Sequence, residues 1–261
     1  MKAKTPPEGA NARAGQPGDD LVFTAELTAP LAANTLPADL LLTEDGAIAL
    51  LQQSELATSV LEQLVRNANL LKSRKVKVAL VAHPRTPRHI ALPLLRQLYT
   101  FDLMQIALTP AVAGDLKRAA DGALCNRLTT ISSGERLALA RRGSGRVAAA
   151  LLHDKETRVM RTALENARLT EAHIIQAITR AASSPTFIET VCHHPQWSLR
   201  REVRIALLRH EKTPMGRALD FARCLPPSQL HEILQNSRLP ENVKAYLVRD
   251  MSQRRRGAGA G

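Results

Sequence analysis

The stretch Val76–Pro87, VKVALVAHPRTP, returns 127 residues later as Val203–Pro214, VRIALLRHEKTP. The register then holds without a gap, and 10 of the 23 positions from 76 to 98 are identical to their partners. Composition alone would give roughly one or two identities over this length. A repeat of fixed length indicates supersecondary units that bury their apolar faces against their neighbours. The pattern therefore predicts the architecture and says little about chemistry.

The composition favours an all-α fold. Hydrophobic residues make up 44% of the chain but aromatic residues only 3%, so Leu, Ala, Val and Ile must build the core. That mixture suits close helix packing better than a β-sandwich, which uses more Thr, Tyr and Phe. Apolar residues also recur at helical spacing, as in Leu61, Leu64 and Val65.

Helix starts are marked by capping residues. Thr43 and Thr170, each followed by Glu, are predicted N-caps, and Ser132–Glu135 predicts a further helix start. Thr86-Pro87 and Thr213-Pro214 each pair a hydroxyl with a proline, which predicts an N-cap followed by proline at the first helical position.

A shorter period is predicted inside the 127-residue repeat. The segment Val159–Asn166 is a looser copy of the Val-x-x-Ala-Leu core with one residue inserted, which gives intervals of 83 and 44 residues to Val76 and Val203. The predicted elementary period is ~42 residues, with about five helical-pair units between residues 40 and 250. Gly143-Ser144-Gly145 interrupts this regularity and is interpreted as a flexible linker between helices.

The helix-pair period, the Val-[Lys/Arg]-[Val/Ile]-Ala-Leu core and the Thr-Pro entries resemble HEAT-like α-solenoids. They are similar in particular to the leucine-rich-variant type found in bacterial proteins of unknown role. The resemblance covers about four-fifths of the chain and implies an armadillo-like α-solenoid that serves as a binding scaffold. It names no partner, because such scaffolds serve unrelated systems.

Three segments are expected. Residues 1–38 are rich in Pro and Gly and predict a flexible leader, residues 39–250 form the α-solenoid, and residues 251–261 form a disordered basic, Gly-Ala tail. No apolar run is long enough for a membrane span, and the three widely spaced cysteines suit a reducing compartment, so we expect a cytoplasmic protein.

Charge is distributed unevenly along the chain. Residues 1–70 carry 4 Lys+Arg and 9 Asp+Glu, a net charge of −5, while residues 71–261 carry 32 Lys+Arg and 15 Asp+Glu, a net charge of +17. Basic residues at equivalent positions of successive units would align as a stripe that attracts an acidic or polyanionic partner. The predicted stripe consists of Arg74, Lys75, Lys77, Arg158, Arg161, Arg200, Arg201 and Arg204. Whether the acidic leader docks on the basic body stays open.

The sequence predicts no metal site and no cofactor. His83 and His210 occupy the same repeat position and are interpreted as turn residues that hydrogen-bond a carbonyl group. Cys192-His193-His194 is the densest cluster of metal-capable side chains, but adjacent helical residues point in different directions. Trp197 aligns with Leu70 and is predicted to lie in the core.

The sequence contains no glycine-rich phosphate-binding loop followed by Lys-Ser/Thr, no HExxH motif and no GxSxG motif. We therefore expect a non-enzymatic scaffold that binds a protein partner, through an acidic segment of that partner. The alternative is a nucleic-acid-binding protein, in its sharpest form similar to the HEAT-like alkylpurine DNA glycosylases. The scarcity of aromatic residues and of an acidic catalytic residue argues against that enzyme activity.

Overall fold

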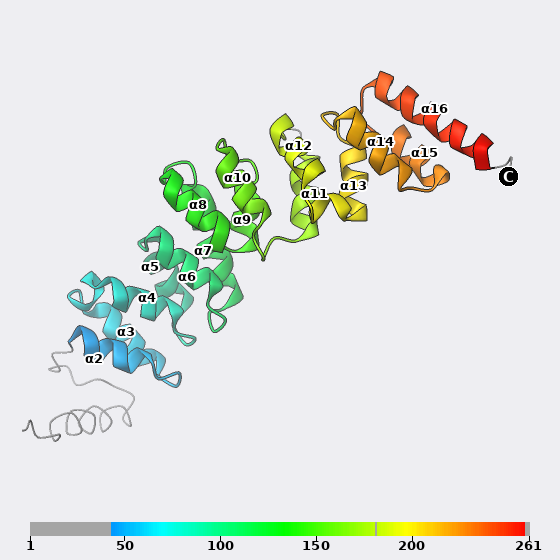
Figure 1. Cartoon of the computed structure of the whole chain (residues 1–261). Coiled ribbons are helices and arrows are strands. Elements are labelled where there is room, and N and C mark those ends of the chain that lie inside the picture. The colour runs from blue at the N-terminus through cyan, green and yellow to red at the C-terminus, as the bar shows by residue number, and fades with distance from the viewer. Residues whose placement is uncertain (1–42, 181, 259–261) are drawn as a thin grey trace, which may run out of the picture. The chain divides into compact units, whose positions relative to one another are not determined.

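The computed structural model describes residues 43–180 and 182–258, with side chains as far as residue 254 (Figure 1). Over these residues the protein is all-helical, with fifteen α-helices, two short 3₁₀ helices and no strand. The chain divides into two compact units after Ala91, within α5, and each unit is described by itself. None of the described helices combines the length and the hydropathy of a membrane span.

The described part of the first unit, residues 43–91, contains three α-helices and the start of a fourth. Its elements are α2 (Glu44–Leu51), α3 (Thr58–Arg66), η1 (Leu70–Lys72), α4 (Arg74–Ala82) and the beginning of α5 (Arg88–Arg96). Helix α2 packs against α4, and the fully buried side chains include Leu61 and Leu80. Leu61 is one of the positions that the helical spacing predicts to lie on one helix face.

The second unit contains the remaining helices. They are α6 (Thr100–Leu108), α7 (Gly114–Arg127), α8 (Ser133–Arg142), α9 (Gly145–Leu151), α10 (Thr157–Leu164), α11 (Glu171–Thr179), α12 (Pro185–His193), η2 (Trp197–Leu199), α13 (Arg201–Leu208), α14 (Met215–Arg223), α15 (Pro227–Gln235) and α16 (Glu241–Ala258). Two series of neighbours run through this unit. Helices α7, α9, α11, α13 and α15 pack in succession, and α8, α10 and α12 form the second series. Further along the chain, α14 packs on α16.

The 127-residue repeat recurs in the secondary structure. Helices α2 to α7 begin 127 residues before α11 to α16, pair by pair, and η1 precedes η2 by the same interval. Leu80 and Leu207, at the same repeat position, are both fully buried. The two copies therefore specify the same succession of helices and turns.

The repeated turn after α4 and α13 is held by side chains. His83 Nδ1 accepts the N–H of Arg85 at 3.2 Å, and His210 Nδ1 accepts that of Lys212 at 3.1 Å. Because Nδ1 is an acceptor, the proton of His83 lies on Nε2, which donates to the carbonyl oxygen of Gln53 at 2.9 Å. The interpretation of both histidines as turn residues is confirmed.

Helix capping is confirmed at three sites and wrong at two. Thr43, Thr170 and Ser132 accept backbone N–H groups of the first turns of α2, α11 and α8. Thr86 and Thr213 instead donate to the carbonyl groups of Leu80 and Leu207, each at 2.6 Å. Their hydroxyls satisfy carbonyl groups at the end of the preceding helix, and α5 and α14 begin one residue after each proline.

The predicted elementary period of ~42 residues is wrong. Helices α9, α11, α13 and α15 begin 26, 30 and 26 residues apart, so the described residues hold more helix pairs than the five expected. The Val159 segment lies in α10, which packs against α8 and α12, whereas the Val203 segment lies in α13, between α11 and α15. Val, Ala and Leu at helical spacing recur in any buried helix face, so this match did not identify equivalent helices.

The structure bears on only one of the two predicted ends of the repeat region. The leader at residues 1–38 lies outside the described residues. The boundary at residue 250 is contradicted, because α16 continues to Ala258. Met251 is buried, and Arg254 forms an i,i+4 ion pair with Asp250 at 2.9 Å, so core packing and charge pairing carry the helix onward.

Candidate functional site: a basic cleft between α9 and α11

The eight predicted stripe residues are divided between the two compact units, and within the second unit they fall on two different series of packed helices. They lie on α4 (Arg74, Lys75, Lys77), on α10 (Arg158, Arg161), just before α13 (Arg200) and on α13 (Arg201, Arg204). Helix α4 belongs to the first unit, and in the second unit α10 and α13 belong to different series of neighbours. The inclusion of Arg158 and Arg161 in the stripe depends on equating the Val159 helix with the Val203 helix, and these two helices are not equivalent.

Several of these basic side chains are engaged locally. Arg204 Nε donates to the carbonyl oxygen of Ser198 at 2.6 Å, and its guanidinium lies 5.9 Å from the centre of the Phe221 ring. Arg201 pairs with Glu202 at 2.9 Å, and Lys75 approaches Glu44 at 3.9 Å. Arg204 thus stabilises its own turn, and exposed pairs such as the other two contribute little to stability.

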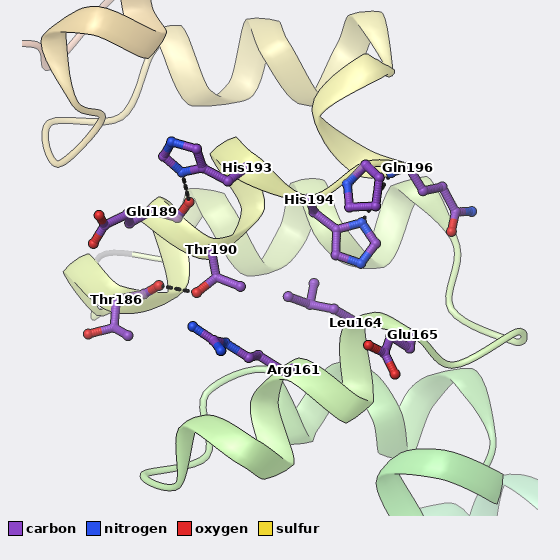
Figure 2. A pocket seen from close by; sticks show the side chains of 10 residues that line it. Arg161, Leu164, Glu165, Thr186, Glu189, Thr190, His193, His194 and Gln196 are labelled. Carbon is purple, nitrogen blue, oxygen red and sulfur yellow. Dashed lines mark hydrogen bonds between the residues drawn. The ribbon is translucent and has the colours of Figure 1, made fainter.

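Arg161, one of the predicted stripe residues, faces a groove. The α10–α12 groove has a volume of about 710 Å³, and Figure 2 shows Arg161 extending from α10 toward Thr186 and Thr190 of α12. It is lined by Arg161, Leu164, Glu165, Thr186, Glu189, Thr190, His193, His194, Pro195 and Gln196. Two carboxylates and one guanidinium give the groove mixed charge, so its lining selects no sign of ligand charge.

A second hollow, the basic cleft, has a volume of about 570 Å³ and lies over α7, α9 and α11. None of its described lining residues is acidic. They are Cys125 of α7; Arg146, Ala149, Ala150 and His153 from α9 and the turn after it; and His173, Gln176, Ala177 and Arg180 from α11 and its C-cap. Each of the last two sets has the spacing i, i+3, i+4, i+7, which places its members on one helix face.

The turn before α9 fixes one end of the basic cleft. Ser144 caps α9 by accepting the N–H of Val147 at 3.3 Å and donates its own proton to Asp121 of α7 at 2.6 Å. A Cβ on Gly145 would collide with the carbonyl oxygen of Arg168 and approach His173 Cε1 to 3.1 Å. The interpretation of Gly143-Ser144-Gly145 as a flexible linker is therefore wrong: the glycine permits close packing against the start of α11.

Arg146, next to this turn, is exposed and forms no ion pair in the described part of the chain. Burial raises the pKa of Asp121, and the hydrogen bond from Ser144 and the charge of Arg146 both oppose that rise. Burial likewise raises the pKa of the Cys125 thiol, again against the charge of Arg146. Arg146 thus lies near two groups of α7 but remains available to a ligand.

The opposite end of the basic cleft is formed by His153 and Arg180. The His153 ring packs against Phe187 of α12 with ring centres 5.3 Å apart. Burial, together with the charge of Arg180, lowers the pKa of His153 and favours the neutral ring. Arg180 itself is exposed and, among the described residues, has no carboxylate at ion-pair distance.

In the Cys192-His193-His194 cluster, both histidine side chains are hydrogen-bonded to backbone groups and the thiol is buried. Burial raises the pKa of the Cys192 thiol to about 12. His193 Nδ1 bonds the carbonyl oxygen of Glu189 at 2.9 Å, while His194 Nδ1 accepts the N–H groups of Gln196 and Trp197. Across residues 43–180 and 182–258, no group of three or more metal-capable side chains is close enough to hold one ion.

Trp197 is buried, and its indole N–H donates to the carbonyl oxygen of Leu164 at 2.9 Å. Its prediction as a core residue is confirmed. Leu70, its partner in the repeat, is also buried and begins η1 as Trp197 begins η2. This ring therefore offers no face on which a nucleobase could stack.

Comparison with family models, with curated proteins and with solved structures finds no match for this chain. The candidate site rests on its own geometry. Sequence reasoning missed Arg146 and Arg180, although one signal was present: Arg and His recur seven residues apart, as 146 and 153 and again, in reverse order, as 173 and 180.

Proposed function

We propose that the protein is a non-enzymatic α-solenoid that binds an acidic segment of a protein partner in the basic cleft. One observation carries the proposal: the cleft presents two arginines and two histidines, and no acidic side chain among its described lining residues. A carboxylate entering it would meet positive charge at either end. The architecture is proposed as similar to HEAT-like scaffolds, with helix pairs shorter than the 40–47 residues typical of HEAT repeats.

The location of the charge supports binding of a polypeptide. Arg146 and Arg180 extend from successive helices of one packed series, so the helices hold the bases of both side chains in place before a ligand arrives. The net charge of +17 on residues 71–261 would speed the encounter with an acidic segment. The Ala side chains between the charged ends leave room for a backbone.

Binding of nucleic acid is the alternative function, and the experiment must distinguish it from binding of a protein partner. A duplex backbone is best followed by a long row of basic residues, and the predicted stripe residues in the second unit fall into two different series of helices. The buried Trp197 removes the most suitable stacking residue. Both observations favour a protein partner.

The test compares probes of equal charge at several salt concentrations. A fluorescent poly-glutamate peptide and a DNA duplex are titrated with the full chain and with the Arg146→Ala/Arg180→Ala variant. We expect the variant to lose at least about tenfold in affinity for the peptide, since each ion pair in a partly desolvated cleft contributes about 1 kcal/mol.

The matched control is Arg158→Ala, which removes an exposed arginine of α10 outside both hollows. Equal losses per removed charge in the control and the cleft variant would mean that net charge alone drives binding. Tight duplex binding with the same affinity in the full chain and in the cleft variant would favour the nucleic-acid alternative.

A further inference from the structure

The two helices that form the basic cleft, α9 and α11, run in the same direction. The first turn of α9 lies beside the start of α11, because Gly145 abuts the carbonyl group of Arg168 and the ring of His173. At the other end of the two helices, His153 lies close enough to Arg180 for that charge to lower its pKa. Arg146 and His173 therefore share one end of the cleft, and His153 and Arg180 share the other.

The two arginines are separated by the length of the cleft. Seven residues of helix span ~10 Å along the axis, and the step from α9 to its neighbour adds a further ~8–10 Å sideways. Arg146 and Arg180 lie diagonally across this space. One carboxylate at one end would leave the second guanidinium without a partner.

The middle of the cleft is lined mostly by short side chains, and none of them is charged. Ala149 and Ala150 of α9 face Gln176 and Ala177 of α11 between the two basic ends. Alanine leaves space for a peptide backbone, and the amide of Gln176 can both donate to and accept from one. The arrangement fits an extended segment that lies along the cleft.

We propose, resting on the function proposed above, that the cleft recognises an extended segment with two acidic residues at positions i and i+3. In the polyproline II conformation these residues lie on one face ~9 Å apart, and the flexible arginine side chains cover the remaining distance. One carboxylate pairs with Arg146 and the other with Arg180. Adjacent acidic residues can reach only one end.

The test uses peptides that differ only in spacing. Four ten-residue peptides of Ala, Pro and Ser carry two Glu residues separated by zero, two, four or six residues, and each is titrated into the full ¹⁵N-labelled chain and followed by NMR at low salt. We expect the peptide with two intervening residues to bind about fivefold more tightly than the peptide with adjacent Glu residues, because it forms a second ion pair. Arg180→Ala should abolish this difference, while Arg158→Ala should leave it intact.

The outcomes separate the two proposals. Arginine-dependent binding that is equal for all four spacings would overturn the two-point recognition and leave the acidic-segment function standing. Absence of binding by every peptide, including poly-glutamate, would overturn both. A preference for a wider spacing that persists in Arg180→Ala would also contradict the pairing proposed here.

Discussion

At the residue scale, the same hydrogen bond recurs at the turns between helices, each time with a polar side chain as its acceptor. This side chain accepts the backbone N–H of the residue two positions later and so closes the turn locally. The residues in this role are Asn67, His83, Asp154, Asn166, His194, His210 and Ser237. The requirement is for a short-range acceptor, so the residue type varies while the hydrogen bond stays.

His210 in this role makes stability depend on pH. Burial lowers the pKa of His210, with Lys212 and Arg238 acting in the same direction and Glu211 opposing them. Between this lowered value and the ordinary pKa of about 6.5, the unfolded chain binds more protons than the folded one. The stabilisation is therefore complete above about pH 7 and is lost as the pH falls through the folded-state pKa.

We predict that His210→Asn reduces the loss of stability between pH 7.5 and pH 5, because Asn supplies the same acceptor without titrating, as Asn67 and Asn166 do. Urea unfolding of both proteins at the two pH values measures the effect. The control is His89→Asn, a change at an exposed position outside this turn. An equal loss in His210→Asn and the parent chain would refute this role of the ring.

At the element scale, local signals predicted helix starts but not helix neighbours. Thr43, Thr170 and Ser132 act within one turn of their own position, so sequence alone identifies them as caps. Thr86 and Thr213 satisfy the same local motif, yet their hydroxyls bond the preceding helix. The choice depends on which backbone group is left buried without a partner, and that is decided by packing.

At Gly145, which the sequence predicts to lie in a flexible linker, close packing against α11 determines which residue is tolerated. We predict that Gly145→Ala destabilises the protein by about 1–3 kcal/mol, because the new methyl group must push α9 away from the Arg168 carbonyl group. Affinity for the poly-glutamate probe should fall as well, since Arg146 moves with α9. The measurements are urea unfolding and the peptide titration described above.

Gly122 is the matched control for this substitution. It lies inside α7 with open space around a Cβ, so Gly122→Ala should stabilise the protein by about 0.5–1 kcal/mol through helix propensity. If both alanines had the same effect on stability, the close approach at Gly145 would not be what requires a glycine.

At the scale of the whole molecule, the sequence predicted the all-α class and the 127-residue repeat, and both rest on patterns shared by many residues. The shorter period, and with it the inclusion of Arg158 and Arg161 in the basic stripe, rested on one loose match at Val159 that does not join equivalent helices. The basic cleft could not be recognised one helix at a time, because Arg146 and Arg180 each read as the solvated edge of an amphipathic helix. Only the packing of α9 on α11 brings their faces together.

The repeat offers a test of how far structural damage spreads. Leu80 and Leu207 occupy the same repeat position and are both fully buried, but they lie in different compact units. Replacing either with Ala should cost about 2–5 kcal/mol through lost contacts and the cavity left behind. Because repeat units interact chiefly with their nearest neighbours, we predict that each variant loses hydrogen-exchange protection mainly within its own unit. Mass spectrometry of Leu207→Ala should therefore find α11, α13 and α15 more exchangeable and α2 to α4 unchanged, with the reverse in Leu80→Ala. A uniform loss of protection in both variants would instead mean that the two units unfold as a single cooperative body.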